Sequence, residues 1–180
     1  MLKTMIELSR LCRPVSLYTN RENTETFHYG IILAVNESEV AINQISPNGD
    51  DDGISVFSVE KVYRIEFGGQ YEKKMKVLCD RKQIPERRVE INGKSILLSV
   101  LQYAFQTKQI ISLSLVDSGC EDVVGIPIGV QDGEWKIQSI DEYGFLDGIS
   151  YVKEDSMTGL TMSREEEKRI AILYHANYDK

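Results

Sequence analysis

One stretch of this chain occurs twice, and the second copy lies 95 residues after the first. Residues 30–78 align with residues 125–173 without a gap, and 14 of the 49 aligned positions are identical. Average amino-acid usage would give unrelated sequences roughly three identities over that length. An internal repeat of this kind decides the architecture before any other feature does. We therefore interpret the chain as an internal duplication.

The repeat predicts the domain organisation of the 180 residues. The first copy is expected over residues 1–79 and the second over residues 94–180, with residues 80–93 as a linker. Units of about 90 residues are long enough to bury a modest core. We expect two small domains of the same kind.

Each copy opens with a helical pattern that leads into a short strand. Apolar residues at helical spacing run from Leu2 to Leu11, before Pro14, and again over residues 95–109 after Asn92-Gly93. Alternating residues then predict further strands. In order, the strands expected are 15–18, 27–35, 40–45 and one long or bent strand over 54–67 in copy one, and 111–115 at the start of copy two.

The end of each copy has two interpretations. Tyr71, Met75 and Leu78 fit a helix, and Ser163-Arg-Glu-Glu166 fits a capping box. Alternation at Met75 and Val77 would also fit a closing strand. We expect a short strand or a single helical turn.

This element order gives the fold class: mainly β with short helices (α+β), as two tandem small barrels of bent strands, each preceded by an α-helix. The order resembles the Sm-like fold of the Sm, LSm and Hfq proteins, and small SH3-like barrels share it. The residues that carry the resemblance are Gly30, the stretch Leu33-Ala-Val-Asn-Glu37 and the strand Val40-Ala-Ile42.

The resemblance implies a scaffold and, in its RNA-binding members, a base held by a loop Asn and an Arg-Gly step. At the position of that step this chain has Ile65-Glu-Phe-Gly-Gly69 in copy one and Leu160-Thr-Met-Ser-Arg164 in copy two. Neither stretch contains an Arg-Gly step. A shared fold does not by itself give a shared function.

The net charge of −7, from 21 basic and 28 acidic residues, disfavours non-specific binding to nucleic acid. The main basic cluster, Arg81-Lys82 and Arg87-Arg88, falls in the predicted linker and is interpreted as a solvated charge run. RNA is therefore a possible partner that the acidic charge disfavours.

The chain is expected to be cytoplasmic, without a membrane segment. No apolar run approaches the ~20 residues that cross a bilayer, and the first ten residues lack the core of a secretion signal. Cys12, Cys79 and Cys120 are odd in number and widely spaced, so we expect three reduced thiols.

Two short motifs suggest ligand sites and are set aside. Asn92-Gly-Lys-Ser95 resembles the end of a phosphate-binding loop, but position 88 is Arg where that loop needs Gly. A helix start explains it better. Asp50-Asp-Asp-Gly53 could attract Ca²⁺, but only Asp52-Gly53 recurs in copy two, which indicates a turn. No cofactor or metal ligand is predicted.

No catalytic constellation is visible, so the chain is expected not to be an enzyme. His28 and His175 fall at non-equivalent places, and Glu165-Glu-Glu167 reads as a solvated face beside Lys168-Arg169. No catalytic, cofactor-binding or metal-binding residue is therefore predicted.

The nine tyrosines are the remaining clue. Tyrosine is favoured at interfaces and is also ordinary on half-buried strands, and the second interpretation is the one we favour. The predicted function is a non-catalytic binding module that engages a protein partner or small ligand through loops or exposed strand edges. The alternative is an RNA-binding regulator of the Sm/Hfq type, which requires a contiguous positive, tyrosine-flanked surface.

Overall fold

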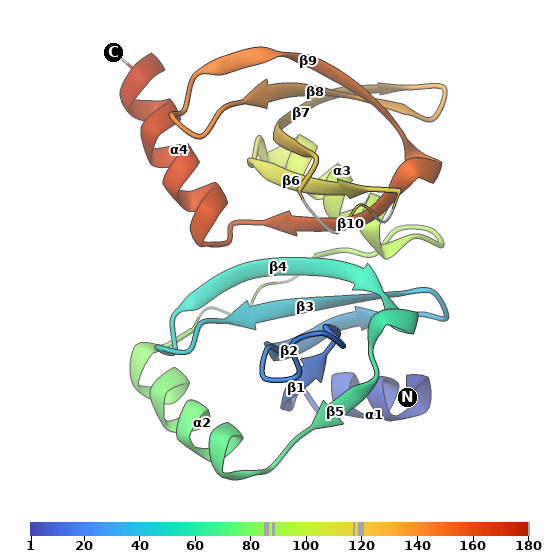
Figure 1. The fold of residues 1–180 in the computed structure, drawn as a ribbon, viewed down its shortest axis with the longest axis vertical. Helices are drawn as coiled ribbons and strands as arrows, with labels where there is room; N and C mark the ends of the chain where they lie inside the picture. The colour runs from blue at the N-terminus through green and yellow to red at the C-terminus, as the bar shows by residue number, and fades with distance from the viewer. Residues whose placement is uncertain (85–86, 88, 117, 119–120, 180) are drawn as a thin grey trace. The chain divides into compact units, whose positions relative to one another are not determined.

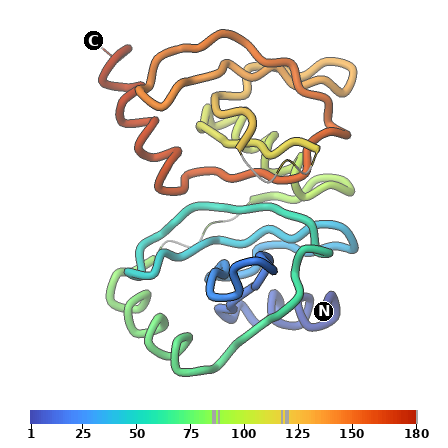
Figure 2. The backbone as a smooth tube through the Cα atoms, viewed as in Figure 1, coloured from blue at the N-terminus to red at the C-terminus, as the bar shows by residue number. Residues whose placement is uncertain are grey.

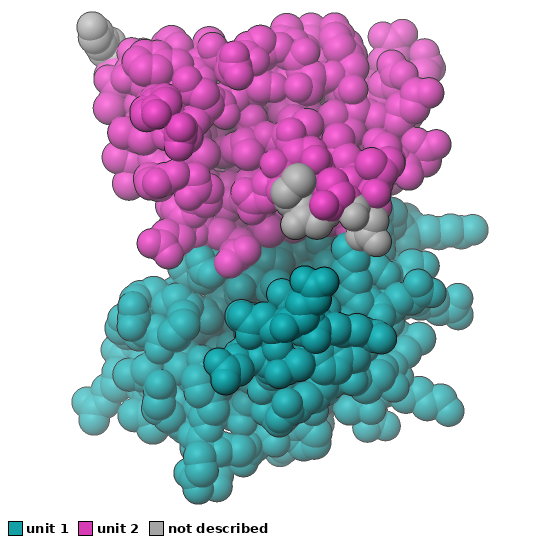
Figure 3. Space-filling view, in the orientation of Figure 1, with its two compact units in different colours: residues 1–96 teal, residues 97–180 magenta. Residues whose placement is uncertain are grey.

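The computed structural model describes residues 1–84, 87, 89–116, 118 and 121–179. The chain divides into two compact units, residues 1–96 and 97–180, which are coloured separately in Figure 3. The division falls close to residue 94, where the second copy was expected to begin. Of the predicted linker, residues 80–82 belong to a helix, and Pro85, Glu86 and Arg88 lie outside the described residues.

Unit 1 contains a helix, five strands with a 3-10 turn between the last two, and a second helix. In chain order these are α1 (Leu2–Arg10), β1 (Pro14–Tyr18), β2 (His28–Val35), β3 (Glu39–Ile45), β4 (Asp51–Ser58), η1 (Val59–Lys61), β5 (Arg64–Glu66) and α2 (Gln70–Lys82). The predicted long strand over 54–67 is thus two strands, because the 3-10 turn η1 interrupts it.

Unit 2 has the same order of elements. They are α3 (Ile96–Thr107), which begins at the last residue of unit 1, β6 (Ile111–Leu115), β7 (Val123–Gln131), β8 (Glu134–Ile140), β9 (Leu146–Lys153), η2 (Glu154–Ser156), β10 (Met157–Met162) and α4 (Glu165–Tyr178). The elements β7, β8, β9, η2 and α4 each begin 95 residues after β2, β3, β4, η1 and α2.

Within each unit the strands form an antiparallel sheet that follows the same order. Unit 1 is ordered β5-β1-β2-β3-β4, and unit 2 is ordered β10-β6-β7-β8-β9 (Figures 1 and 2). The structure is therefore α+β with mainly β structure, as predicted. The paired registers describe open sheets, and hydrogen-bonded closure into two barrels is not shown by them.

A glycine lets β2 approach β3 closely in unit 1, and another lets β7 approach β8 in unit 2. A Cβ built on Gly30 would lie 1.9 Å from the backbone oxygen of Asn43, and one on Gly125 would lie 2.1 Å from that of Gln138. The register shifts also correspond. They fall at Ile32/Ala34 and Asn43/Ile45 in unit 1, and at Pro127/Gly129 and Gln138/Ile140 in unit 2. Such bulges bend and twist a sheet.

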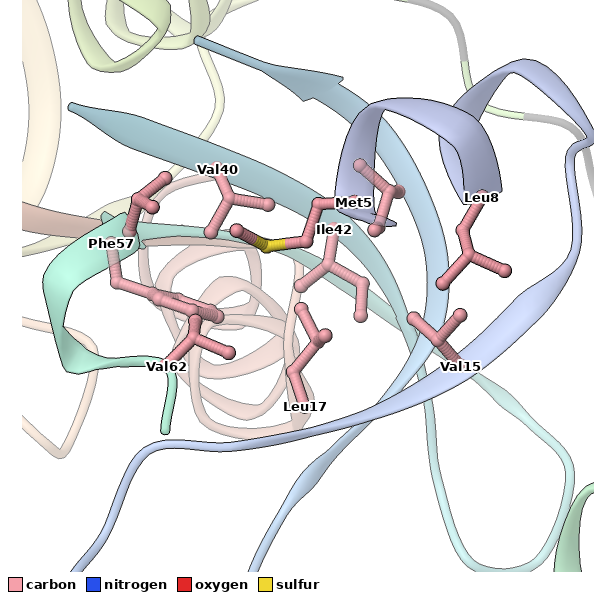
Figure 4. Packing of buried hydrophobic residues seen from close by; sticks show 10 residues of the cluster. Met5, Leu8, Val15, Leu17, Val40, Ile42, Phe57 and Val62 are labelled. Atoms are coloured by element: carbon pink, nitrogen blue, oxygen red, sulfur yellow. The ribbon is translucent and has the colours of Figure 1, made fainter. Parts of the chain in front are cut away.

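The main core of unit 1 lies between α1 and the inner face of its sheet. In Figure 4 the side chains of Met5 and Leu8 point from α1 toward Val15, Val40 and Ile42. Burying aliphatic side chains of this kind contributes roughly 1.5–3 kcal/mol each. The apolar spacing along 2–11 thus marks the face of α1 that packs on the sheet.

A second, smaller core lies on the other face of each sheet, under the last helix. Met75 of α2 packs with Tyr29 and Ile45, and Ile170 of α4 packs with Ile110 and Ile140. The expectation of a short strand or one helical turn at the end of each copy was wrong, because α2 has 13 residues and α4 has 14. The apolar positions of these tails are too few to show a clear helical face by themselves.

A glutamate side chain caps the N-terminus of α2, and another caps that of α4. The Gly69 amide donates to Glu72 Oε2 at 2.9 Å, and the Arg164 amide donates to Glu167 Oε2 at 2.8 Å. The predicted capping box placed this role on Glu166, one residue too early. The same glutamates satisfy helix-end amides that would otherwise lack an acceptor.

Candidate functional site

The acidic cluster that resembled a Ca²⁺ site is paired with basic side chains. Lys82 Nζ lies 2.6 Å from Asp50 Oδ1, and Arg87 contacts Asp51 through two hydrogen bonds of 2.6 and 3.1 Å. These carboxylates therefore hold the end of α2 and Arg87 against the start of β4. The interpretation as a solvated charge run is wrong for Arg87, whose side chain is 24% exposed, whereas the Lys82–Asp50 pair lies in solvent. Arg88 lies outside the described residues.

The stretch Asn92-Gly-Lys-Ser95 precedes a helix, as predicted, because α3 begins at Ile96. Ser95 Oγ and the Ile96 amide both donate to the Glu39 carboxylate, at 3.0 and 2.5 Å. A carboxylate already occupies the amide that a phosphate would need.

The two histidines have separate surroundings. His28 begins β2, where its ring stacks on Phe57 with centroids 4.7 Å apart and its Nδ1 lies 3.3 Å from Gln44 Oε1. His175 lies in α4 and pairs with Asp179 at 2.6 Å on the surface. Across the described ranges, no three His, Cys, Asp or Glu side chains gather as a metal site would require.

Cys12 and Cys79 are free thiols, and Cys120 lies outside the described residues. Cys12 is exposed after α1, whereas Cys79 is half-buried on α2. Burial and the neighbouring Asp80 raise the pKa of the Cys79 thiol. No helix in the described part of the chain is long and apolar enough to span a membrane.

A buried serine–glutamate pair occurs once in each unit and was not anticipated from the sequence. Ser16 Oγ donates to Glu72 Oε1 at 2.7 Å, and Ser112 Oγ donates to Glu167 Oε1 at 2.6 Å. Glu167 was predicted on a solvated face, yet only 2% of it is exposed. The strict 95-residue spacing of Glu72 and Glu167 was the signal that could have found them.

Unit 2 adds a further carboxylate to its pair. Burial, and then the nearby negative charge of Glu167, raise the pKa of Glu121. Two neighbouring carboxylates favour the protonated form of one of them. Thr161 Oγ1 also donates to Glu167 Oε1, at 2.6 Å, so the cluster serves to join β6, β10 and α4.

The strand β9 presents an exposed apolar edge in unit 2. It ends the strand order, and among the described residues of unit 2 it pairs with β8 alone. Leu146, Ile149 and Tyr151 expose 44%, 47% and 68% of their surface. Figure 2 shows β9, in orange, along the border of this unit. Exposed strand edges with apolar side chains readily accept another strand.

The turn before β9 continues this surface. Tyr143 and Phe145 are 64% and 52% exposed. The Asn177 amide of α4 donates to the Tyr143 carbonyl at 3.2 Å, and the Leu146 amide donates to Tyr178 Oη at 3.2 Å. The turn is thus anchored to α4, and its aromatic side chains are held on a fixed backbone.

The charges along this edge are predominantly acidic. Asp147 lies on β9 itself, and the turns on either side of the strand carry Asp141, Glu142, Glu154 and Asp155. The basic residues are Lys153 on β9 and Lys136, whose Nζ lies 5.9 Å from the Tyr151 ring centroid. We call β9 with Tyr143 and Phe145 the β9 edge. It combines apolar side chains, unpaired strand backbone and negative charge.

A cluster of tyrosine and arginine lies on unit 1. The Arg64 guanidinium sits 4.4 Å from the Tyr18 ring centroid, and Arg21 sits 5.9 Å from that of Tyr63. Glu66 forms an ion pair with Arg64 and accepts a 2.7 Å hydrogen bond from Tyr18. The positive charge of this cluster is therefore offset by a carboxylate within it.

A groove of about 1160 Å³ opens in unit 1 between α2, the outer face of the sheet and the end of α1. Its apolar surface includes Ile31, Leu33 and Phe67. Arg13 and Lys73 lie on it, and neither side chain has an ion pair or hydrogen bond within the described residues. Apolar clefts of this size with a few polar groups are typical of small-molecule sites.

No protein-family model, curated protein or solved structure matches this chain.

Proposed function

We propose that the chain is a tandem pair of Sm-like or SH3-like units that arose by internal duplication. The 95-residue spacing supports this, together with the identical strand order, the corresponding register shifts and the glycines at 30 and 125. Closure of each bent sheet into a small barrel belongs to the same proposal. The fold supplies a scaffold, and function then depends on the surfaces where the two units differ.

The function that we propose is a non-catalytic, cytoplasmic binding module whose β9 edge takes up an extended segment of a protein partner. The observation that carries it is the exposure of Leu146, Ile149 and Tyr151 on a strand with an unpaired edge. In strand addition the backbone supplies affinity, and alternate side chains supply specificity. Apolar side chains on such an edge otherwise favour aggregation.

The acidic surroundings define the chemistry of this partner. Asp147 on the strand, and Glu142 and Asp155 beside it, would attract a segment that carries lysine or arginine. Opposite charges across an interface mainly raise the association rate and exclude wrong partners. We therefore expect a segment in which apolar residues alternate with basic ones.

Selection from a random nonapeptide display library tests this function. Peptides enriched on the full chain should alternate apolar and basic residues, and should bind far more weakly to Ile149→Lys and Tyr151→Lys. Ile172→Lys is the matched control, because Ile172 is 70% exposed on α4 and lies outside the β9 edge. Enriched peptides that bind all three variants equally, or no enrichment, would reject the proposed site.

RNA binding is the second candidate. It is favoured by two arginine–tyrosine contacts, in which the guanidinium groups of Arg64 and Arg21 lie over the rings of Tyr18 and Tyr63. Aromatic rings and arginine are the groups on which bases stack. Fluorescence polarisation with A-rich and U-rich oligonucleotides at low salt tests it. Binding that is lost in Tyr63→Ala would favour RNA, and no binding at low salt would exclude it.

A further inference from the structure

We propose that the groove beside α2 in unit 1 binds a small amphipathic anion, with a carboxylate or phosphate head and an apolar body. The site lies in a different unit from the β9 edge and does not depend on the function proposed above. Its lining comes from α1, β2, β3 and α2, from the chain that leads into β1 and α2, and from Gln83, Ile84, Arg87 and Val89 after α2.

The size and surface of the groove fit the apolar body. Its volume of about 1160 Å³ can hold a ligand of drug or lipid size. Ile31 and Leu33 of β2 form one side, and Phe67, which is 52% exposed, lies at the approach to α2. A ligand that covered these side chains would remove apolar surface from water, which is favourable by roughly 25 cal/mol per Å².

The charges fit an anionic head. Lys76 is paired with Asp80 at 2.8 Å, and Glu72 is buried and already accepts from Ser16 and Gly69. Arg13 and Lys73 therefore provide the positive charge that no described side chain neutralises. In a chain of net charge −7, this is a local site for a negative ligand. Arginine and lysine bind carboxylate and phosphate through charge-assisted hydrogen bonds.

Cys79 lines the groove, and it packs in the same cluster as Tyr29, which is not itself a lining residue. The Tyr29 hydroxyl is buried with no hydrogen-bond partner in the described part of the chain. Cys79 and Glu72 lie close enough to Tyr29 to affect its pKa, which burial raises most. A buried hydroxyl without a partner is uncommon in folded proteins.

Calorimetric measurement of the binding of four decyl compounds to the full chain tests the proposal. Decanoate and decyl phosphate should bind more tightly than decanol and decyltrimethylammonium, which have the same tail without the negative charge. The better of the two anions then identifies the head group. If all four compounds bind equally, or none binds, the proposal is wrong.

Charge variants locate the site. The double variant Arg13→Gln/Lys73→Gln should weaken binding of the anions by about tenfold or more, because two charge-assisted contacts are lost. Lys3→Gln/Lys153→Gln is the control, since both lysines are exposed and lie outside the groove. Equal affinities of both double variants would overturn the assignment.

A protection experiment on the unmutated groove decides the question even if the double variant does not fold. In a Cys120→Ser background, decanoate should slow alkylation of Cys12 and Cys79, which both line the groove. Decyltrimethylammonium at the same concentration should not. Unchanged alkylation of both thiols under saturating decanoate would contradict binding in this groove.

Discussion

Ser16 and Glu72 form a buried hydrogen bond of 2.7 Å that joins the first strand of unit 1 to its last helix. Ser112 and Glu167 form the equivalent bond of 2.6 Å in unit 2. In both units the other carboxylate oxygen accepts the amide at the start of the helix. One glutamate thus sets where the helix begins and where it packs.

Ser16→Ala should therefore destabilise the protein. It leaves Glu72 Oε1, on a residue that is 7% exposed, without its donor, and hydrogen bonds to charged groups contribute about 1.5–3 kcal/mol. Chemical denaturation should show a loss of that size. Ser38→Ala, at an exposed serine, should change the free energy of unfolding by less than about 0.5 kcal/mol. Equal effects of the two substitutions would contradict the role of the pair.

Gly30→Ala should be more damaging than any substitution of a surface glycine. The added methyl group would lie 1.9 Å from the Asn43 carbonyl oxygen, so the two strands must separate. We expect a loss of more than about 3 kcal/mol, or failure to fold.

Gly129→Ala is the matched control, because no atom lies within 4 Å of a Cβ built there and unit 1 has Ala34 at the equivalent position. Thermal melting of both variants measures the difference. A Gly30→Ala protein as stable as Gly129→Ala would show that β2 and β3 do not approach this closely.

Cys12 should react faster than Cys79 with iodoacetamide near neutral pH. Cys12 is exposed, whereas burial raises the pKa of the Cys79 thiol and reduces its thiolate fraction. Mass spectrometry of peptides from a Cys120→Ser protein measures both rates. Alkylation of Cys79 should accelerate as the pH rises toward its elevated pKa, and faster reaction of Cys79 at pH 7 would refute its half-buried position.

Stability should fall at alkaline pH through Tyr18. Burial, and then its hydrogen bond to Glu66, raise the pKa of Tyr18 from 10.0 to about 12. The neutral phenol of Tyr18 contributes to the free energy of unfolding. This contribution is fully present below pH 10 and is lost as the pH rises through 12. Between pH 9 and 11 the urea midpoint of Tyr18→Phe should therefore decline less than that of the wild type. The exposed Tyr151→Phe is the control, and parallel declines of all three proteins would contradict the prediction.

The element order was largely predictable, because amphipathic spacing and turn residues are local signals. The expected strand at 111–115 coincides with β6, and the helix over 2–11 is α1. The helices that end the two copies, α2 and α4, were not predicted. Their stability depends on tertiary contacts, such as Met75 with Tyr29 and Glu72 with Ser16, which residue spacing does not display.

The candidate surfaces were less predictable than the fold. Binding through strand edges stays a prediction, and the sequence around 146–153 does not say which strand ends the sheet of unit 2. The groove depends on side chains from α1, β2 and α2, which are far apart in sequence. The positive charge of the groove also depends on Lys76 being paired with Asp80, while Lys73 has no ion pair within the described residues.

Amide hydrogen exchange on β9, with and without a peptide selected on the full chain, tests the proposed function most directly. Addition of the peptide should protect those amides of residues 147–153 that face away from β8 and leave those of α2 unchanged, because a new strand pairs with the edge of β9. Protection confined to unit 1, or a bound peptide that leaves exchange along β9 unchanged, would contradict strand addition at this edge.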